Sequence, residues 1–207
     1  MGKHVQSIDS QVLDRIRDKG TGAVFRAADF FDIGCRSAID QALSRQSRAG
    51  TIRRIARGLY DLPADHPLLG RLNAPSDAVA RAFASRDATR IQPTGAAAAN
   101  DLGLSDQVPM KVVYLTDGRS RRLQLGKLQI DLRHASPRNM TTAGRVSGTV
   151  VQALRWLGRG GVDDRTVSAL RRRLSDTDKA QLLQDLGYAP AWIADIMRRV
   201  AQPDGNP

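Results

Sequence analysis

The sequence predicts an α+β protein made of two parts. Three helical segments come first and are followed by a strand pair around a glycine; then, beyond a proline-containing segment, short strands are followed by helices. This order of elements is typical of two small α+β domains rather than of one alternating βαβ fold. The prolines and Gly70 between residues 62 and 75 interrupt every period, so we expect domains at residues 1–66 and 75–200.

The first helix is predicted from Ser7, because Ile8, Val12 and Ile16 recur every four residues and Gly20 follows as a stop. A second, shorter helix is expected over residues 27–31. These two segments would pack against the helix that comes next.

The third helix is expected from residue 36 or 37 to Arg48, after a tight turn at Gly34. Its apolar stripe consists of Ala38, Ile39, Ala42 and Leu43. Residues 51–55 and 59–63, joined through Gly58, then predict a β-hairpin. Together these elements predict a winged helix-turn-helix with the hairpin as its wing.

In the second domain, residues 76–87 and 94–102 predict helices, and residues 111–116 a strand. Residues 123–125 and 128–132 alternate as a hairpin with Gly126 first in a two-residue turn, so we expect a small antiparallel sheet. Four C-terminal helices should follow, at residues 146–157, 165–174, 176–186 and 190–200.

Composition narrows the class of protein. Of 207 residues, 41% are hydrophobic and 26% charged, which is typical of a globular chain and not of a disordered one. Cys35 is the single cysteine and no apolar run reaches the length of a membrane span or a secretory signal. We therefore expect a cytoplasmic protein with no membrane partner.

The formal net charge of +11 favours a polyanionic partner, and its distribution matters more than its size. Residues 1–35 hold five Lys or Arg and five Asp, whereas residues 36–57 hold six Arg against Asp40 alone. The excess thus falls on the third helix and the hairpin, the two elements that a winged helix places on a DNA duplex.

We therefore predict double-stranded DNA as the partner. Outer positions of the third helix would contact base edges and phosphates in the major groove: Arg36, Ser37, Asp40, Gln41, Ser44, Arg45 and Arg48. Arginines of the hairpin would contact phosphates or enter a minor groove: Arg53, Arg54 and Arg57. The alternative is a protein-interaction module with solvated arginines.

A second basic cluster lies in the other domain, opposed by Asp131. It is composed mainly of Arg119, Arg121, Arg122, Lys127 and Arg133, with Arg138 and Arg145 further on. A second DNA contact, an acidic protein partner and a solvated face all remain open.

Catalytic and metal-binding patterns are weaker. Asp117, Asp131 and Arg133 resemble part of a metal-dependent nuclease site, but Arg stands where Lys is expected. Histidines 4, 66 and 134 are scattered. We predict a non-enzymatic protein without metal or cofactor.

Two stretches resemble a known family. Residues 30–63, with Ala38-Ile39-Asp40-Gln41-Ala42-Leu43-Ser44-Arg45 and Arg57-Gly58-Leu59-Tyr60-Asp61-Leu62-Pro63, are similar to the N-terminal domain of the AbiEi antitoxins of type IV toxin-antitoxin systems, which act in abortive infection. Residues 93–109, followed by Lys111-Val112-Val113-Tyr114-Leu115-Thr116-Asp117-Gly118, resemble the start of their C-terminal domain. Residues 7–135 carry the resemblance.

This resemblance implies a transcriptional repressor that binds inverted repeats in the promoter of its own operon. It also implies that the C-terminal domain counters a nucleotidyltransferase-like toxin. The alternative is a solitary winged-helix transcription regulator with no toxin partner, and a neighbouring nucleotidyltransferase-like gene would favour the antitoxin.

Overall fold

The protein has an α+β fold, as expected, in a computed structural model that describes residues 6–68, 70–107 and 109–202. It forms two compact units, Met1–Phe83 and Ala84–Pro207, here called the N-terminal and C-terminal units. The division falls inside helix α3 (Ser76–Arg86), whereas the sequence placed the change of domain between residues 66 and 75. None of the described helices has the length and apolar character needed to cross a membrane.

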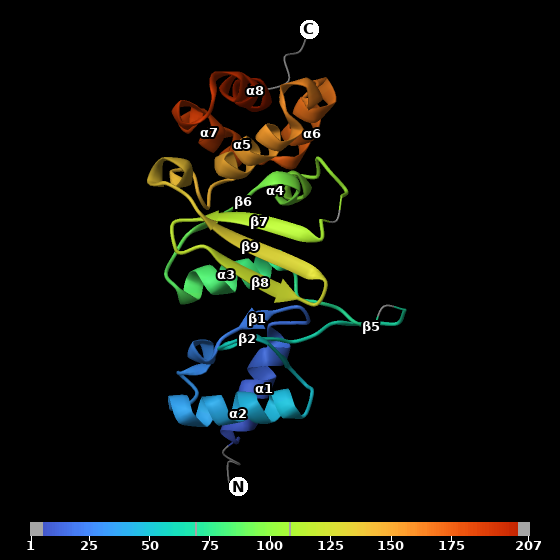
Figure 1. Ribbon diagram of the computed structural model, residues 1–207, viewed down its shortest axis with the longest axis vertical. Coiled ribbons are helices and arrows are strands. Elements are labelled where there is room, and N and C mark those ends of the chain that lie inside the picture. The colour runs from blue at the N-terminus through green and yellow to red at the C-terminus, as the bar shows by residue number, and fades with distance from the viewer. Residues whose placement is uncertain (1–5, 69, 108, 203–207) are drawn as a thin grey trace. The chain divides into compact units, whose positions relative to one another are not determined.

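The N-terminal unit begins with three helical segments, labelled in Figure 1. They are α1 (Ile8–Asp18), the 3-10 helix η1 (Ala27–Phe30) and α2 (Arg36–Arg48). The bounds of α1 and α2 agree with the prediction. The expected second helix is a single 3-10 turn, with its Asp29 carboxylate bonded back to the Arg26 backbone N–H.

A three-stranded antiparallel sheet with order β1-β3-β2 completes the core of this unit. Strands β2 (Arg53–Ala56) and β3 (Leu59–Asp61) form the predicted hairpin, and β1 (Val24–Phe25) adds to it. The Phe25 ring meets the Phe30 ring edge-on, with centroids 5.7 Å apart, and stacks on Tyr60. The sheet and the helices thereby share one core.

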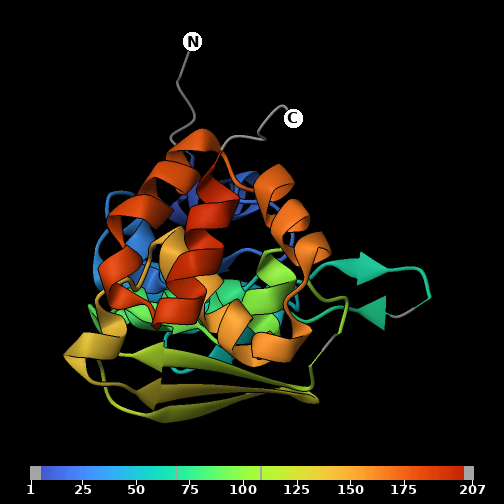
Figure 2. The ribbon, with the colours of Figure 1, turned by 90° about the horizontal axis from the view of Figure 1, so that it is seen from above.

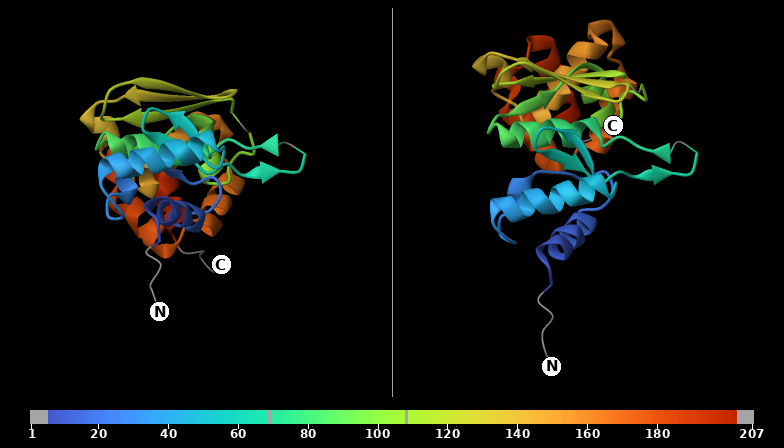
Figure 3. Two further views of the ribbon diagram at one scale, coloured as in Figure 1. Left: turned by 90° about the horizontal axis from the view of Figure 1, so that it is seen from below. Right: turned by 60° about the horizontal axis from the view of Figure 1, so that its bottom comes forward.

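The proline-containing segment is more ordered than the sequence suggested. Strands β4 (Asp65–His66) and β5 (Gly70–Arg71) pair as a two-stranded ribbon where no regular structure was expected. Figure 3 shows the ribbon projecting beyond the end of α2. At its base the Arg71 guanidinium donates to the Gly50 carbonyl at 2.8 Å. Because the ribbon depends on such bonds and not on a local apolar period, the sequence pattern did not predict it.

The C-terminal unit contains a four-stranded sheet with order β6-β7-β9-β8. Its strands are β6 (Ile91–Pro93), β7 (Lys111–Thr116), β8 (Arg121–Leu125) and β9 (Leu128–His134). The hairpin β8–β9 is confirmed, but β7 and β9 pair in parallel, so the expectation of an antiparallel sheet was wrong for this pair. The residues between β7 and β8 pass the end of β9, where Ser120 accepts from the His134 N–H. Strand β9 therefore enters between β7 and β8 and runs the same way as β7.

Helices cover this sheet in two layers, visible in Figures 1 and 2. Helix α4 (Gly95–Asp101) contacts β7, and α5 (Val146–Leu157) contacts β6. Gly148 permits this close approach, because a Cβ there would collide with the Gln92 carboxamide and lie 2.5 Å from the Thr142 carbonyl oxygen.

The outer layer packs on α5 and encloses the core of the C-terminal unit. Its helices are α6 (Asp164–Arg173), α7 (Asp176–Gln184) and α8 (Ala191–Ala201). Three 3-10 turns join neighbouring elements of this unit: η2 (Pro137–Met140) precedes α5, η3 (Arg159–Gly161) lies between α5 and α6, and η4 (Leu186–Tyr188) lies between α7 and α8. The four predicted C-terminal helices are confirmed with small shifts at their ends.

Candidate nucleic-acid interface

Helix α2 has one buried face and one exposed face. Ile39, Ala42 and Leu43 are fully buried in the core of the N-terminal unit. Six of the predicted DNA-contacting side chains lie exposed on the other side: Arg36, Ser37, Asp40, Gln41, Arg45 and Arg48. Ser44 is half-buried. The structure therefore brings the polar positions of α2 onto one continuous helical surface.

Two of the arginines on α2 are paired with aspartates. The Arg45 guanidinium lies 2.7 Å from the Asp9 carboxylate on α1, and Arg36 lies 3.7 Å from Asp40 one turn along. Both arginines are more than half exposed, so solvent screens these pairs and they can exchange for a phosphate or a base at little cost. Asp40 thus lies within ion-pairing distance of Arg36 on the same helix.

Arg48 differs from these two because it has no ion pair within the described part of the chain. It lies in the last turn of α2, where its charge also interacts favourably with the helix dipole. Arg48 therefore contributes a full positive charge to the exposed side of the helix.

Ser37 belongs to the first turn of α2 and is already engaged locally. Its hydroxyl lies 3.3 Å from the Cys35 sulfur. This contact, helped by the backbone N–H of Ala38, lowers the pKa of the Cys35 thiol. A base contact by Ser37 would have to compete with this weak bond to sulfur.

Arg53 was predicted to contact DNA from the hairpin, but in the structure it bonds within the N-terminal unit. Its guanidinium makes a two-pronged contact with Asp61, at 3.1 Å and 2.6 Å, and donates to the Leu72 carbonyl at 3.1 Å. Asp61 is fully buried, so this pair stabilises the sheet and ties it to the chain after the ribbon. A phosphate would have to displace a buried carboxylate to bind Arg53.

The other two hairpin arginines are exposed. Arg54 alternates with Arg53 along β2, so it extends from the opposite face of the strand, and it has no ion pair among the residues described. Arg57 lies exposed in the turn beside Gly58, whose φ of 73° permits the tight reversal. The hairpin thus presents Arg54 and Arg57 while it retains Arg53.

Part of the second basic cluster is ion-paired within the C-terminal unit. Arg122 and Lys111 lie 3.1 Å and 3.3 Å from the Asp131 carboxylate, and Arg133 lies 3.8 Å from it. Arg121 pairs with Asp87 at 3.1 Å. Arg119 and Lys127 are exposed in the loop before β8 and the turn after it.

Asp131 is the centre of this arrangement and is 6% exposed. Burial alone would raise the pKa of its carboxyl group, but hydrogen bonds from Gln129, Lys111 and Arg122 outweigh burial and hold the pKa below its ordinary value. Asp131 is therefore a negative charge that several cations share.

The two aspartates of the nuclease-like pattern serve separate partners. Asp117 accepts from the Arg90 side chain at 2.9 Å and from the Arg90 backbone N–H at 2.8 Å, which lowers the pKa of Asp117. The register sets Asp131 beside Val113, four residues before Asp117. No cluster of three metal-ligating side chains occurs in the residues that the structure covers.

Comparison with known proteins places the chain in a family. A family model described as "Family of unknown function (DUF6088)" matches residues 11–182. The chain belongs to DUF6088. The DUF6088 match includes α2, the hairpin and the four-stranded sheet, and it ends before η4 and α8.

Among solved structures, this DUF6088 protein is similar to the RV2827C protein from Mycobacterium tuberculosis. The two chains are 15% identical with a TM-score of 0.44, and the similarity covers 93% of this chain and 81% of the other. No curated protein matches the sequence.

Proposed function

We propose that the protein is a DNA-binding transcriptional repressor whose N-terminal unit acts as a winged helix-turn-helix. The order of its elements supports this: α1, the η1 turn, α2, and then the hairpin β2–β3 with β1 beside it. In such a domain the last helix enters the major groove, which is about 12 Å wide, and the hairpin follows the neighbouring backbone.

The observation that carries the proposal is the set of exposed arginines on these two elements. Arg48 and Arg54 lack an ion pair within the described residues, and the pairs of Arg36 and Arg45 are exposed enough to exchange. Releasing counterions from phosphates is the main source of affinity for such a surface. Gln41 and Ser37 would then supply hydrogen bonds to base edges.

We further propose that this repressor is the antitoxin of a type IV toxin-antitoxin system. The resemblance of residues 30–63 and 93–118 to AbiEi-like antitoxins supports this role. Under this proposal the N-terminal unit represses its own operon at inverted repeats, and the C-terminal unit counters a nucleotidyltransferase-like toxin. The competing proposal is a solitary winged-helix regulator, which shares the DNA-binding surface and has no toxin to counter.

One full-length variant separates these roles. Replacing Arg48 and Arg54 with alanine should relieve repression of a reporter driven by the protein's own promoter, because two phosphate contacts are lost. The same variant should still restore growth to cells that express the adjacent gene as an inducible toxin. A control that removes a single charge is Arg17→Ala, at an exposed arginine of α1 near Asp14, which should leave both readouts unchanged.

Either readout can refute part of the proposal. Undiminished repression by the double variant would remove α2 and the hairpin as the DNA surface. Absence of toxicity from any adjacent gene would favour the solitary regulator. If the double variant fails to restore growth while Arg17→Ala restores it, the antitoxin role depends on DNA binding.

A further inference from the structure

A cavity of about 410 Å³ lies within the C-terminal unit, away from the sheet arginines discussed above. Three segments line it: η2 and the residue before it, one position on α5, and the end of η4 with the two residues that lead into α8. The lining residues are Ser136, Arg138, Asn139, Arg155, Gly187, Tyr188, Ala189 and Pro190. Its volume falls within the range of about 300–1,000 Å³ that is typical of small-molecule sites.

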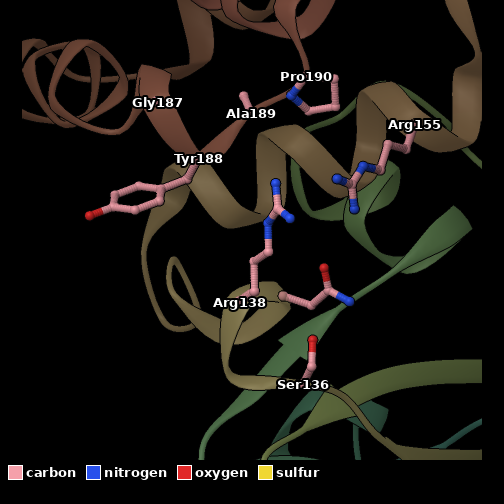
Figure 4. Close-up of a pocket in the computed structure, with 8 residues that line it drawn as sticks. Ser136, Arg138, Arg155, Gly187, Tyr188, Ala189 and Pro190 are labelled. Carbon is pink, nitrogen blue, oxygen red and sulfur yellow. The ribbon is translucent and has the colours of Figure 1, made fainter.

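Two arginines face this cavity without a counterion. Figure 4 shows the side chains of Arg138 and Arg155 extending into the space between η2 and the turn at residues 187–190. Neither guanidinium forms an ion pair or a hydrogen bond with any other residue that the structure describes. Most other arginines near the sheet have an aspartate partner, as Arg121 and Arg122 do. Two like charges held at one cavity favour the binding of an anion.

A buried aspartate holds the wall of the cavity in place. Asp185 is 2% exposed and accepts hydrogen bonds from Arg145 at 2.7 Å, from the Ser147 hydroxyl and from Gln181 at 3.1 Å. These bonds fix η4 to the start of α5, and the Tyr188 backbone N–H donates back to the Asp185 carbonyl. With Arg145 as its cationic partner, Asp185 stabilises the site without neutralising Arg138 or Arg155.

The remaining groups are suited to phosphate. Ser136 and Asn139 supply a hydroxyl and a carboxamide, which are neutral donors. Pro190 is the N-cap of α8 and provides no side-chain cap, so the positive end of an eleven-residue helix borders the cavity. Tyr188 is 57% exposed, and its ring extends away from the two arginines (Figure 4), so an organic group attached to the phosphate would have to reach outward to stack on it.

We propose that this cavity binds a small phosphate monoester with a planar organic part, such as a mononucleotide. Arg138 and Arg155 bind the phosphate oxygens, and Tyr188 contacts the organic part. This site goes beyond the proposed DNA binding, which rests on residues of the N-terminal unit.

Calorimetric titration of the full-length protein with adenosine monophosphate and with inorganic phosphate tests the proposal. Arg138→Gln and Arg155→Gln should each weaken adenosine monophosphate binding by at least about tenfold, because each removes a charge-assisted contact. Arg119→Gln removes the same charge from an exposed loop of the same unit and should change the affinity less than about twofold. Tyr188→Ala should lower affinity for adenosine monophosphate toward that for inorganic phosphate and leave the latter unchanged.

The same series can overturn the assignment. An equal loss in Arg119→Gln would show that net charge, and not this cavity, attracts the anion. Lack of saturable binding by either probe would refute the site. Binding of a single-stranded oligonucleotide, but not of adenosine monophosphate, that depends on Arg138 and Arg155 would reassign the cavity to a nucleic-acid backbone. Thermal unfolding without ligand checks the fold of each variant, and because both arginines are exposed their replacement should not lower Tm.

Discussion

In the N-terminal unit Arg48 and Arg54 extend from α2 and β2 with no ion pair in the described residues, whereas in the C-terminal unit Arg122 and Arg133 share Asp131 with Lys111. Both regions are dense in arginine in the sequence. The difference comes from Asp131, which lies among these cations on the central strand β9. A shared carboxylate among the cations, rather than the number of arginines, therefore distinguishes the two regions.

The largest effect on stability should come from Arg53, the hairpin arginine that is paired with an aspartate as Arg122 is in the C-terminal unit. Arg53→Ala leaves Asp61 buried without its partner, so the free energy of unfolding should fall by about 3–5 kcal/mol. Arg54→Ala is the matched control on the same strand, and its effect should stay within about 0.5 kcal/mol. The free energy of unfolding of each variant is measured in urea, with hydrogen exchange of peptides from residues 1–83 as the probe. Equal stability of the two variants would show that Arg53 does not support the sheet.

Base recognition by α2 should have the next largest effect. Gln41→Ala should weaken binding to the specific operator by about 1–3 kcal/mol and leave binding to random duplex nearly unchanged. A fluorescence anisotropy titration with both duplexes gives the ratio. Arg48→Ala is the informative comparison, because loss of a phosphate contact should weaken both duplexes alike. A parallel loss in the Gln41 variant would mean that this helix does not distinguish sequences.

Removing the Asp131 carboxylate should make the cations of the C-terminal unit more like the unpaired arginines of the N-terminal unit. Asp131→Asn leaves Lys111, Arg122 and Arg133 without their common acceptor and should increase non-specific DNA binding. The log-log slope of affinity against salt should steepen by up to about 0.9 for each cation that reaches a phosphate. Asp106→Asn, in an exposed loop, adds the same net charge and should not change the slope. A slope equal to that of the wild type would show that these cations do not reach DNA even when released.

The smallest effect concerns pH. Because the pKa of Asp131 is lowered in the folded protein, its contribution to stability is present above about pH 4 and is lost as the pH falls through the lowered pKa. The Asp131→Asn variant should thus be less stable than the wild type at pH 7, and the difference should shrink below about pH 4. Tryptophan fluorescence in urea reports on the C-terminal unit, since Trp156 and Trp192 both lie there. A stability difference that is constant with pH would contradict this role.

Local periods allowed much of the fold to be predicted from the sequence. The apolar stripe of α2 and the glycine turns at Gly58 and Gly126 are each determined by residues close together in the sequence. The parallel pairing of β7 with β9 depends on which strand enters between two others, and no short stretch encodes that. The ribbon β4–β5 depends in the same way on bonds such as that of Arg71 to Gly50.

The candidate sites were harder to predict than the elements. The exposed positions of α2 follow from its helical period, so they were accessible to sequence analysis. The partner of Arg53 was not identified, although an aspartate between the apolar residues Tyr60 and Leu62 was a signal that a buried cation would be needed. The cavity at Arg138 is lined by residues 136–139, Arg155 and residues 187–190. Because these segments are far apart in the sequence, they form no motif.

The central claim is that α2 and the hairpin provide the DNA-binding charge, and two double variants that each remove two arginines test it most directly. Affinity for the protein's own promoter duplex is measured by anisotropy over a range of salt concentrations. Arg48→Ala with Arg54→Ala should reduce the log-log slope by about 1.8, whereas Arg121→Ala with Arg122→Ala should leave it unchanged. A slope that is the same in all three proteins, or that falls only in the second variant, would contradict the account.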